Sequence, residues 1–394
     1  MNPFRTPGLA AKITLLAVLY LCQGLPTGFF TVAVPVLLRE RGASLTVIGA
    51  SSVLALPWMA KFVWASRVDA IGTRRGWILG LQVATVGLMV AIATGLDERA
   101  LYPLLLAVFL TNLFAATQDI ATDGLAVDLL GDDERGLGNA VQVAGYRAGM
   151  ILGGGALLVL LDDLGWRAAF LAMAGILALC TVPVLLHQER RHTRPPSPGV
   201  FAFLRLPGVL PWLGVLGFFK LGEAMGTGMV KAWLVDIDLS KESIGWLLGV
   251  GGFGASLVGA MVGGSFVNRL GRRASLVLFG ALQSLAVLGY GAAAWSGEGV
   301  QAAVLAEHFL SGMATTALFT VMMDACRPGE GGSDYTAQAS VVVFAMGLGQ
   351  AASGFIAESV GYPGLNLVGG VLSLAGALLM GIVPLWRAEV PART

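Results

Sequence analysis

The segment LYPLLLAVFLTNLFAATQDIATDGLAVDLL, residues 101–130, decides the fold class of this chain. It is apolar over more than the roughly 20 residues that a helix needs to cross a bilayer. It also contains Asp119 and Asp123, which are four residues apart and therefore lie on one face of a helix. A carboxylate at the centre of a membrane helix costs roughly 2.5–3.5 kcal/mol on insertion scales. Two acids at that cost indicate a wet cavity or a compensated charge cluster inside a helical bundle.

The rest of the chain has the composition of a membrane protein. Its 394 residues are 56% hydrophobic and 12% charged, with a mean hydropathy of +0.77, whereas a soluble domain is about 25% charged. Glycine is abundant, at 55 residues, as expected where membrane helices approach closely. The net charge of +1 gives no sign of a polyanion partner, so nucleic-acid binding is excluded. The sequence predicts an all-α integral membrane protein.

No residue pattern indicates a metal, a cofactor or a disulfide. Cys22, Cys180 and Cys326 are far apart, and no CxxC or His/Cys cluster occurs, so we expect small buried hydrophobic side chains at these positions. The glycine-rich stretches 153–155 and 249–254 lack the context of a dinucleotide site and the GK[ST] of a P-loop. We expect these glycines to serve close helix packing.

Twelve apolar segments are long enough to cross a membrane. They lie near residues 11–37, 46–66, 76–96, 101–126, 137–160, 166–187, 208–235, 243–266, 274–296, 300–323, 335–357 and 363–386. The longest polar stretch, residues 187–205, is basic and proline-rich and follows the sixth segment. The sequence therefore predicts an N-terminal six-helix bundle (1–187), a cytoplasmic linker (188–207) and a C-terminal six-helix bundle (208–394).

The lysines and arginines of the loops predict the orientation in the membrane. With the N-terminus in the cytoplasm, the opposite side carries only Arg39, Arg41, Arg99, Arg167 and Lys241, and the other loop cations lie on the cytoplasmic side. An even number of spans then places both termini in the cytoplasm.

The two halves of the sequence repeat each other at a fixed offset. Ile48 and Ile244 open the second and eighth spans, and Asp128 and Asp324 end the fourth and tenth, at an offset of 196 residues in both cases (244−48 and 324−128). SRVDAIGTRRG follows the second span and GSFVNRLGRR the eighth. Parallel halves of this kind place a solute site between them at mid-membrane.

These two loops resemble the G-x-L-x-D-R-x-G-R-R loop of the major facilitator superfamily. The first departs from that pattern through Ala65 and one extra residue before the arginine pair, and the second through Asn268 in place of aspartate. The segments LPWMAKFVWASRVD, ATQDIATDG, DDERGLGNAVQVAGYRAGM and LGWRAAF resemble the AmpG-like branch. That branch includes muropeptide permeases, RhtX/FptX-type siderophore importers and acetyl-coenzyme A transporters. The opening QGLPTGFFTVAVPVLLRERGASLTVIG is most similar to the siderophore importers.

The resemblance implies a major facilitator fold, with twelve transmembrane helices in two pseudo-symmetric six-helix bundles. It implies a monomeric secondary transporter of a bacterial inner membrane, which imports an organic solute by rocker-switch alternating access. Proton coupling is expected, with sodium as the alternative ion. A siderophore-like solute is favoured, and a muropeptide or an acyl-coenzyme A is the alternative.

Two other classes were weighed against transport. A membrane-embedded enzyme would need a catalytic set, but HExxH and GxSxG are both absent, so we expect no catalytic residue. A non-transporting sensor would usually carry a soluble tail or domain, and the twelve segments consume most of the chain.

Buried polar residues are the candidate solute contacts. The bases Lys61, Arg147 and Lys220 fall inside spans, which implies a solute that carries carboxylate or phosphate groups. The alternative is that acids and bases only neutralise one another. The other candidate solute contacts are Gln23, Trp58, Gln118, Asp119 and Glu223.

The candidate proton carriers are Glu307, His308 and Asp119, because a desolvated carboxylate or an imidazole can load and release a proton near neutral pH. The alternative for the first two is that Glu307 pairs with Lys220 and His308 donates to a helix carbonyl.

The arginine-pair loops, residues 69–75 and 268–273, are expected to act as a cytoplasmic gate. For Asp123 we favour a structural or gating role with Arg74, Arg75 or Arg135, because it lies near the end of its span. The candidate gating residues are Asp69, Arg74, Arg75, Asp123, Arg135, Asn268, Arg272 and Arg273.

Overall fold

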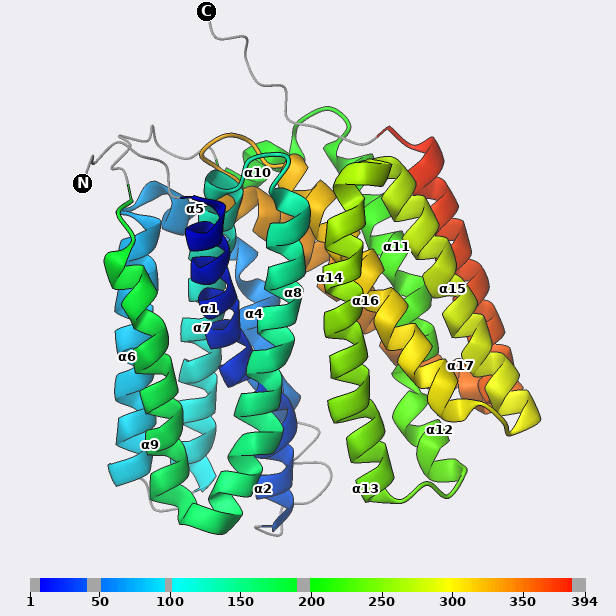
Figure 1. Ribbon diagram of the computed structural model, residues 1–394, viewed down its shortest axis with the longest axis horizontal. Coiled ribbons are helices and arrows are strands. Elements are labelled where there is room, and N and C mark those ends of the chain that lie inside the picture. Colours follow the sequence, from blue (N-terminus) through cyan, green and yellow to red (C-terminus); the bar gives the residue numbers. More distant parts are fainter. Residues whose placement is uncertain (1–7, 41–50, 96–100, 190–198, 385–394) are drawn as a thin grey trace, which may run out of the picture. The chain divides into compact units, whose positions relative to one another are not determined.

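The computed structural model describes residues 8–40, 51–95, 101–189 and 199–384. Every regular element within these ranges is a helix (Figure 1), which confirms the expected all-α architecture for the described part of the chain. The first half contains α1 (Leu9–Gly28), η1 (Phe29–Ala33), α2 (Val34–Glu40), η2 (Ser51–Ala55), α4 (Leu56–Ala60), α5 (Phe62–Ala70), α6 (Arg74–Gly95), α7 (Leu101–Leu129), α8 (Arg135–Ile151), η3 (Leu152–Ala156) and α9 (Leu157–Leu186). The second half contains α10 (Gly199–Leu204), α11 (Val209–Gly228), α12 (Val230–Asp236), α13 (Lys241–Ile244), η4 (Gly245–Gly252), α14 (Phe253–Leu270), α15 (Arg272–Ser296), α16 (Val300–Asp324) and α17 (Gly331–Ile382).

The helices account for the twelve expected spans. By length and composition, eight helices of the described part of the chain are long and apolar enough to cross a membrane. Two of these eight, α9 and α17, contain a kink at a glycine with positive φ, Gly165 (78°) and Gly361 (70°), so α17 supplies two spans and the first part of α9 continues α8. The remaining spans consist of shorter helices joined in series: η2 to α5, and α11 with α12. The start of the second expected span, residues 46–50, lies outside the described residues.

The chain forms two compact units. Unit 1 comprises Met1–Gly131, Gly145–Val200 and Pro328–Thr336, and unit 2 comprises Asp132–Ala144, Phe201–Arg327 and Ala337–Thr394. Each unit therefore consists mainly of one half of the sequence and takes in a short segment of the other half. Helix α8 begins in unit 2 and ends in unit 1, and α17 begins in unit 1 and continues in unit 2.

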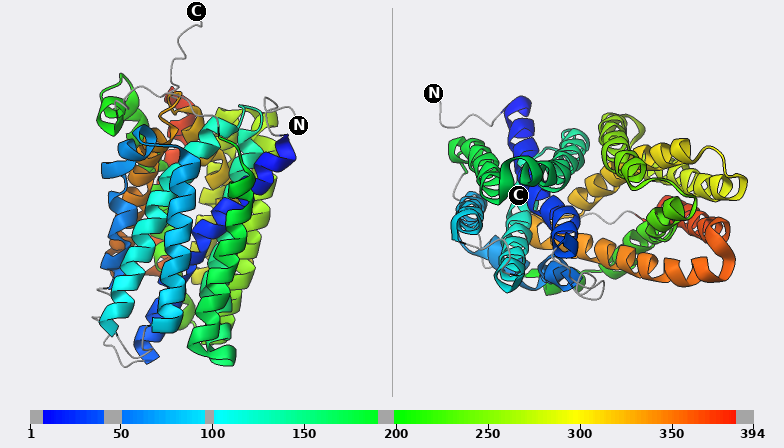
Figure 2. Two further views of the ribbon diagram at one scale, coloured as in Figure 1. Left: turned by 90° about the vertical axis from the view of Figure 1, so that its left-hand side faces the viewer. Right: turned by 90° about the horizontal axis from the view of Figure 1, so that it is seen from below.

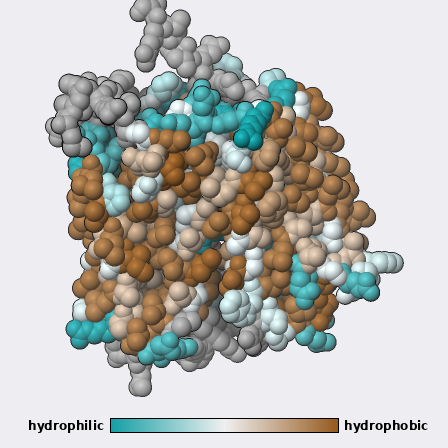
Figure 3. Space-filling view, in the orientation of Figure 1, coloured by the Kyte–Doolittle hydropathy of each residue, from teal (hydrophilic) through white to brown (hydrophobic). Residues whose placement is uncertain are grey.

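Within each unit, long helices pack side by side. In unit 1, α6 packs against both α7 and α9, as Figure 2 shows from two directions. In unit 2, α16 packs against both α14 and α15. The outward faces of the long helices carry apolar side chains. Leu179 on α9 is 72% exposed, and Phe355 on α17 is 78% exposed. Figure 3 shows mainly hydrophobic side chains along the helices and hydrophilic ones near helix ends, the distribution expected of helices in contact with lipid.

The three cysteines lie in apolar surroundings, as expected. Cys22, Cys180 and Cys326 are all buried, and the first two belong to the same hydrophobic cluster in unit 1. None of them forms a disulfide with another described residue.

The first span contains Gly24, Pro26 and Gly28, residue types that can break a helix. Helix α1 continues through all three, and the irregular π-helical turn follows at Phe29–Ala33. The two glycines instead allow close contact with α8. A Cβ atom on Gly24 would lie 2.1 Å from the Tyr146 carbonyl oxygen, too close for any side chain.

The glycines of η3 complete this contact. A Cβ on Gly153 would lie 2.0 Å from the Leu25 carbonyl oxygen, and one on Gly154 would lie 2.9 Å from Cβ of Val32. Gly155, in the same segment, has open space at this position. Close packing is thus confirmed for two of the three glycines at 153–155. Among the glycines at 249–254, Gly252 packs against the His308 ring.

The packing of α1 against η3 gives a direct prediction. Replacing Gly153 with alanine forces the two backbones apart and should destabilise the protein by roughly 1–3 kcal/mol, as overpacking generally does. Gly155→Ala adds the same atom where nothing lies within 4 Å, so it is the matched control and should unfold like the wild type. Thermal unfolding of the two purified variants in detergent measures the difference. Equal midpoints would contradict the proposed close contact.

Candidate functional site

A cluster of buried polar side chains lies in unit 1. Lys61, between α4 and α5, forms an ion pair with Asp119 on α7. Their side chains are 7% and 11% exposed, so the two charges compensate each other away from solvent. The indole of Trp58 lies over this pair, with its ring centre 5.5 Å from Lys61 Nζ. Its Nε1 donates to Asn112 Oδ1 at 3.1 Å.

Asp123 lies one turn along α7 from Asp119 and is 2% exposed. The hydroxyl of Tyr20, on α1, donates to Asp123 Oδ1 at 2.9 Å. We expected Asp123 near an arginine of the gate. The described hydrogen bond of Asp123 is the one from Tyr20, and Arg74 pairs with Asp69 and Asp128, so the gating role of Asp123 stays a prediction.

The other predicted contacts of the first half lie on the same helices. The amide of Gln23 on α1 is buried and lies 3.2 Å from Thr122 Oγ1 on α7. Gln118 is buried on α7. Arg147 is half-buried on α8, next to Tyr146, whose hydroxyl donates to Thr27 Oγ1 at 3.0 Å.

Unit 2 contains a second buried ion pair. Lys220 Nζ lies 2.5 Å from Glu223 Oε2, one turn further along α11. Two hydroxyls of α16 complete the group: Lys220 donates to Thr315 Oγ1 at 2.9 Å, and Ser311 donates to Glu223 Oε1 at 2.7 Å. Lys220 and Glu223 are 3% and 7% exposed. This cluster therefore has the same charge content as the pair formed by Lys61 and Asp119.

Glu307 and His308 make no described contact with Lys220 or Glu223. The alternative pairing of Glu307 with Lys220 is not formed, because Lys220 is bound to Glu223. Glu307 Oε2 accepts from the Tyr290 hydroxyl at 3.2 Å and lies 3.2 Å from His308 Nδ1. His308 Nδ1 is also 2.9 Å from the Val304 carbonyl oxygen. Glu307 Oε1 is buried and has no hydrogen-bond partner among the described residues.

The first arginine-pair loop binds the start of α17 within unit 1. Arg74 forms ion pairs of 3.2 Å with both Asp69 and Asp128. Asp69 Oδ2 accepts from the backbone N–H and the hydroxyl of Ser333, at 2.6 and 2.7 Å. Ser333 lies in the first turn of α17, where the unpaired N–H groups of a helix favour an anion.

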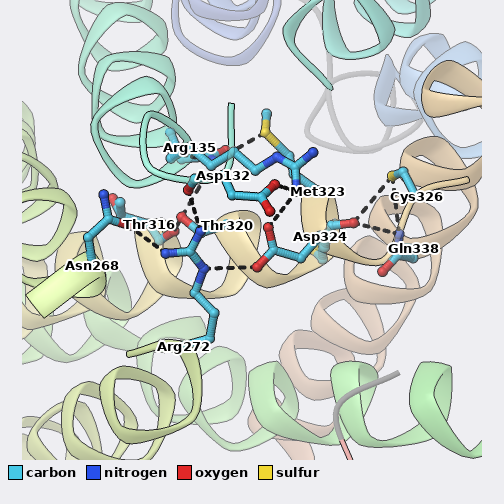
Figure 4. A network of polar contacts seen from close by, with 12 residues as sticks. Asp132, Arg135, Asn268, Arg272, Thr316, Thr320, Met323, Asp324, Cys326 and Gln338 are labelled. Carbon is cyan, nitrogen blue, oxygen red and sulfur yellow. Dashed lines mark hydrogen bonds and ion pairs between the residues drawn. The ribbon is translucent and has the colours of Figure 1, made fainter. Parts of the chain in front are cut away.

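The second loop makes the corresponding contacts within unit 2 (Figure 4). Arg272 pairs with Asp324 at 2.8 Å, and Arg135, in the first turn of α8, pairs with the other oxygen of Asp324 at 2.7 Å. Arg135 also pairs with Asp132, at 2.9 Å. Asn268 accepts from Arg272 through its side-chain oxygen. In this loop one acid, Asp324, pairs with two arginines. In the first loop one arginine, Arg74, pairs with two acids.

The second arginine of each pair holds the end of a helix. Arg75 donates to the carbonyl oxygens of Val184 and Leu185, at 3.0 and 2.8 Å. Arg273 donates to those of Gly381 and Val383, each at 3.2 Å. Both guanidinium groups therefore cap the last carbonyls of a helix, α9 or α17, a favourable position for a cation. The expected gating role of Arg75 and Arg273 stays a prediction.

A carboxylate caps the start of α6 in the same region. Glu189 accepts from the backbone N–H groups of Arg74 and Arg75, at 3.2 and 2.7 Å. Nearby His187 has a pKa below its usual value, because burial disfavours the imidazolium. The Glu189 carboxylate raises this pKa and Arg75 lowers it.

Several contact residues could not be selected from the sequence. The sequence does contain a sign that Asp128 and Asp324 matter, because they occupy equivalent positions of the two halves at the offset of 196 residues. Tyr20 and Tyr290 had none, since a tyrosine in an apolar segment is as often a core residue as a hydrogen-bond donor. The same holds for the polar residues Ser311, Thr315 and Ser333.

Comparison with known proteins gives the family. Residues 16–332 match the family model of the Major Facilitator Superfamily. The chain is 30% identical over 339 residues to an anhydromuropeptide permease of Escherichia coli (strain K12), an alignment that covers 80% of this chain and 68% of that protein. A transporter of Rickettsia conorii named AmpG 4 is 25% identical, over 92% of this chain and 94% of that protein.

Solved structures support the same fold. The human organic anion transporter MFSD10 superposes with a TM-score of 0.78 at 16% identity, covering 95% of this chain and all of that one. FucP, a transporter of the superfamily in its outward conformation, gives a TM-score of 0.74 at 12% identity, covering 94% and 98%. The chain therefore belongs to the major facilitator superfamily, in its AmpG-like branch, and is a multi-pass membrane transporter, not an enzyme.

Proposed function

We propose that this transporter imports an anionic organic solute across a bacterial inner membrane with the entry of protons. The observation that carries the proposal is a buried lysine in each unit, Lys61 and Lys220, each balanced by a single carboxylate. A buried charge left alone is very unfavourable. The carboxylate of a solute can replace Asp119 or Glu223 without leaving the lysine unpaired, so both lysines are suitable anion-binding groups.

The relatives support a muropeptide as the solute class. Two of them are named an anhydromuropeptide permease and an AmpG transporter, and a muropeptide carries the peptide carboxylates that buried lysines would bind. We therefore favour this solute over the siderophore that the first span suggested. The siderophore remains the comparison ligand in the experiment below.

Proton coupling is supported by the buried acids. Glu307 has no lysine or arginine partner among the described residues, and it accepts only from Tyr290 and the neighbouring His308. We assign Glu307, with His308, as the proton carrier of the second half, and Asp119 as the corresponding group of the first.

The helix-end contacts support alternating access. Asp69 with Ser333, and Arg135 with Asp324, join residues from opposite halves of the sequence. We place these contacts, and both termini, on the cytoplasmic side, because the arginine-rich loops favour that side. Movement of one half of the sequence against the other requires both contacts to break, so they act as the gate. We propose that the transporter acts as a monomer.

Removing one acid should destabilise the protein more at the second arginine-pair loop than at the first. Asp324→Asn leaves Arg135 and Arg272 without their shared carboxylate, and we expect a loss on the order of 3 kcal/mol, as for a broken buried pair. Asp128→Asn is the matched variant in the first half. Its side chain is 32% exposed and Arg74 keeps Asp69, so the loss should be about 1 kcal/mol or less. Thermal unfolding compares the two variants.

The same variants test the gate. In a cysteine-free background, a cysteine introduced at buried Thr320 should react faster with a membrane-impermeant maleimide in inside-out vesicles when Asp324→Asn is present. Equal labelling rates with and without Asp324→Asn would rule out a gating role for this acid.

Solute binding should depend on the buried pair of unit 2. The double variant Lys220→Gln/Glu223→Gln removes both charges together, so no charge remains unpaired. We expect it to bind 1,6-anhydro-N-acetylmuramyl tripeptide at least about tenfold more weakly, equivalent to about 1.4 kcal/mol. The control is Lys231→Gln, which changes an exposed lysine of the neighbouring helix α12.

Uptake into proteoliposomes with an imposed proton gradient measures the transport that follows binding. Ferric siderophore uptake is measured alongside. Siderophore uptake without muropeptide uptake would replace the proposed solute. Unchanged uptake in the double variant would remove Lys220 from the solute site.

A further inference from the structure

We infer that the proton carried by Glu307 and His308 is held on Nε2 of His308, with Glu307 as an ionised counter-ion, and that Gly252 positions the imidazole ring for this. The inferred arrangement deepens the proposed function, because it locates the carried proton on one atom. That this proton drives transport rests on the proposed function, whereas the hydrogen positions on the ring do not.

The contacts of Nδ1 determine which ring nitrogen carries the hydrogen of a neutral His308. Nδ1 lies 2.9 Å from the carbonyl oxygen of Val304, one turn earlier on α16. A backbone carbonyl only accepts hydrogen bonds, so Nδ1 is the donor in this contact. In a neutral imidazole the other nitrogen then carries no hydrogen. Nε2 is therefore the nitrogen of His308 that can receive a proton.

Glu307 has the contacts of an ionised carboxyl group. Its Oε2 accepts from the Tyr290 hydroxyl at 3.2 Å and lies 3.2 Å from His308 Nδ1, which carries a hydrogen. Its other oxygen, Oε1, is buried and has no hydrogen-bond partner among the described residues. A hydrogen on Oε1 would have no described acceptor, and one on Oε2 would compete with two hydrogen-bearing groups. The proton of this group therefore belongs on His308.

A proton on Nε2 makes the group electrically neutral. With a neutral ring, Glu307 and His308 together carry one negative charge, and no lysine or arginine of the described residues pairs with Glu307. A buried charge without a partner is unfavourable. Uptake forms one N–H bond at Nε2 with a proton from water, and the imidazolium then pairs with the Glu307 carboxylate. Release breaks the same bond and returns the proton to water.

The elements packed against α16 in unit 2 bring no unpaired charge to the ring within the described residues. The segment η4 has the uncharged sequence GWLLGVGG, and the one charged residue of α14, Arg269, lies in its last turn. Tyr290 on α15 donates to Glu307. On α11, Lys220 and Glu223 pair with each other and contact α16 one or two turns further along. Glu307 is thus the charged group in contact with His308.

Gly252 leaves the space that the Nε2 edge of the ring occupies. It is the last residue of the π-helical segment η4. A Cβ atom on Gly252 would lie 2.6 Å from Cδ2 and 2.8 Å from Nε2 of His308, so any side chain here would move the ring. The side chain of His308 is 20% exposed and that of Glu307 is 3% exposed, so the ring is the more accessible of the two groups.

The position of His308 along α16 suits the import of a proton. It lies eight residues from Val300 (308−300) and sixteen from Asp324 (324−308), or about 12 Å and 24 Å along the helix axis. The end at Asp324 is the one that we place in the cytoplasm. His308 is therefore in the half of α16 that is further from the cytoplasm, where a proton for import arrives.

The position of the hydrogen is tested without any solute. The full-length protein contains three histidines, so labelling with 15N-histidine gives few signals, and His308→Gln identifies those of His308. Nitrogen NMR distinguishes a ring nitrogen that carries a hydrogen from one that does not. We expect a hydrogen on Nδ1 alone at alkaline pH and on both nitrogens at acidic pH. A neutral ring with its hydrogen on Nε2 overturns the inference.

The counter-ion is tested in the same titration. Glu307→Gln removes the charge and nearly keeps the shape, so this variant should bind the proton at Nε2 about tenfold more weakly or worse. Its neutral ring should still carry the hydrogen on Nδ1, because the Val304 carbonyl is unchanged. A titration identical to that of the wild type would show that Glu307 is not the counter-ion.

The positioning role of Gly252 has a matched control. Gly252→Ala moves the ring, so it should change the ratio of the two neutral tautomers or the proton affinity of Nε2. Gly249→Ala adds the same atom in the same π-helical segment, where nothing lies within 4 Å, and should titrate like the wild type. A Gly252→Ala protein that is less stable but has the wild-type tautomer and titration would reduce Gly252 to a packing role. If Gly252→Ala does not fold, the wild-type tautomer and the Glu307→Gln titration still decide where the proton is held.

Transport is measured separately, so that failure of the proposed function can be recognised. Uptake of 1,6-anhydro-N-acetylmuramyl tripeptide driven by a proton gradient should be lost in His308→Gln proteoliposomes, while exchange of the tripeptide without a gradient persists. If the NMR result is as expected but a gradient drives no uptake by the wild type, the proton on Nε2 stands and the proposed coupling is wrong. If His308→Gln keeps gradient-driven uptake, the proton on Nε2 is not the one transported.

Discussion

Burying a charge in an apolar helical bundle is the constraint on which the rest of this structure depends. Every lysine deep in a unit is matched by an acid within contact: Lys61 with Asp119, and Lys220 with Glu223. Such pairs contribute little net stability, because desolvation of both ions offsets their attraction. Their persistence in a chain with 12% charged residues is therefore explained better by function than by folding. Under the proposed function, each lysine stays paired, first with its own acid and then with the solute.

The two arginines of each arginine-pair loop make different kinds of contact, although they are adjacent in the sequence motif. Arg74 and Arg272 bind acids at the ends of α7 and α16, whereas Arg75 and Arg273 hold the final carbonyls of α9 and α17. The first kind of contact joins groups that can separate at the cost of one ion pair. The second fixes a helix end inside its own half of the sequence. Adjacent arginines thus bind different kinds of group, and only the coordinates distinguish them.

The sequence was sufficient for the fold class, the number of spans and the acid–base content of the first cluster. Hydropathy and length determine a membrane helix almost alone, and a buried lysine requires a buried acid. The partner of a given charge was harder to predict. Lys220 had two acids within reach, Glu223 and Glu307, and the choice depends on the rotation of α16 about its axis. Tyr20, which donates to Asp123 from another helix, could not be found from spacing along the chain.

The distribution of the two units along the chain has a consequence for biosynthesis. Unit 1 includes Pro328–Thr336, and Asp69 binds Ser333 within that segment. A nascent chain that has emerged as far as the end of α9 therefore still lacks part of this unit, and 146 further residues (333−187) must be synthesised before Asp69 can bind its partner. At about 5–20 residues per second, the delay is on the order of 10 s or more. During that interval, the insertion machinery or a chaperone has access to an incomplete first half, so quality control can act before the transporter is able to close.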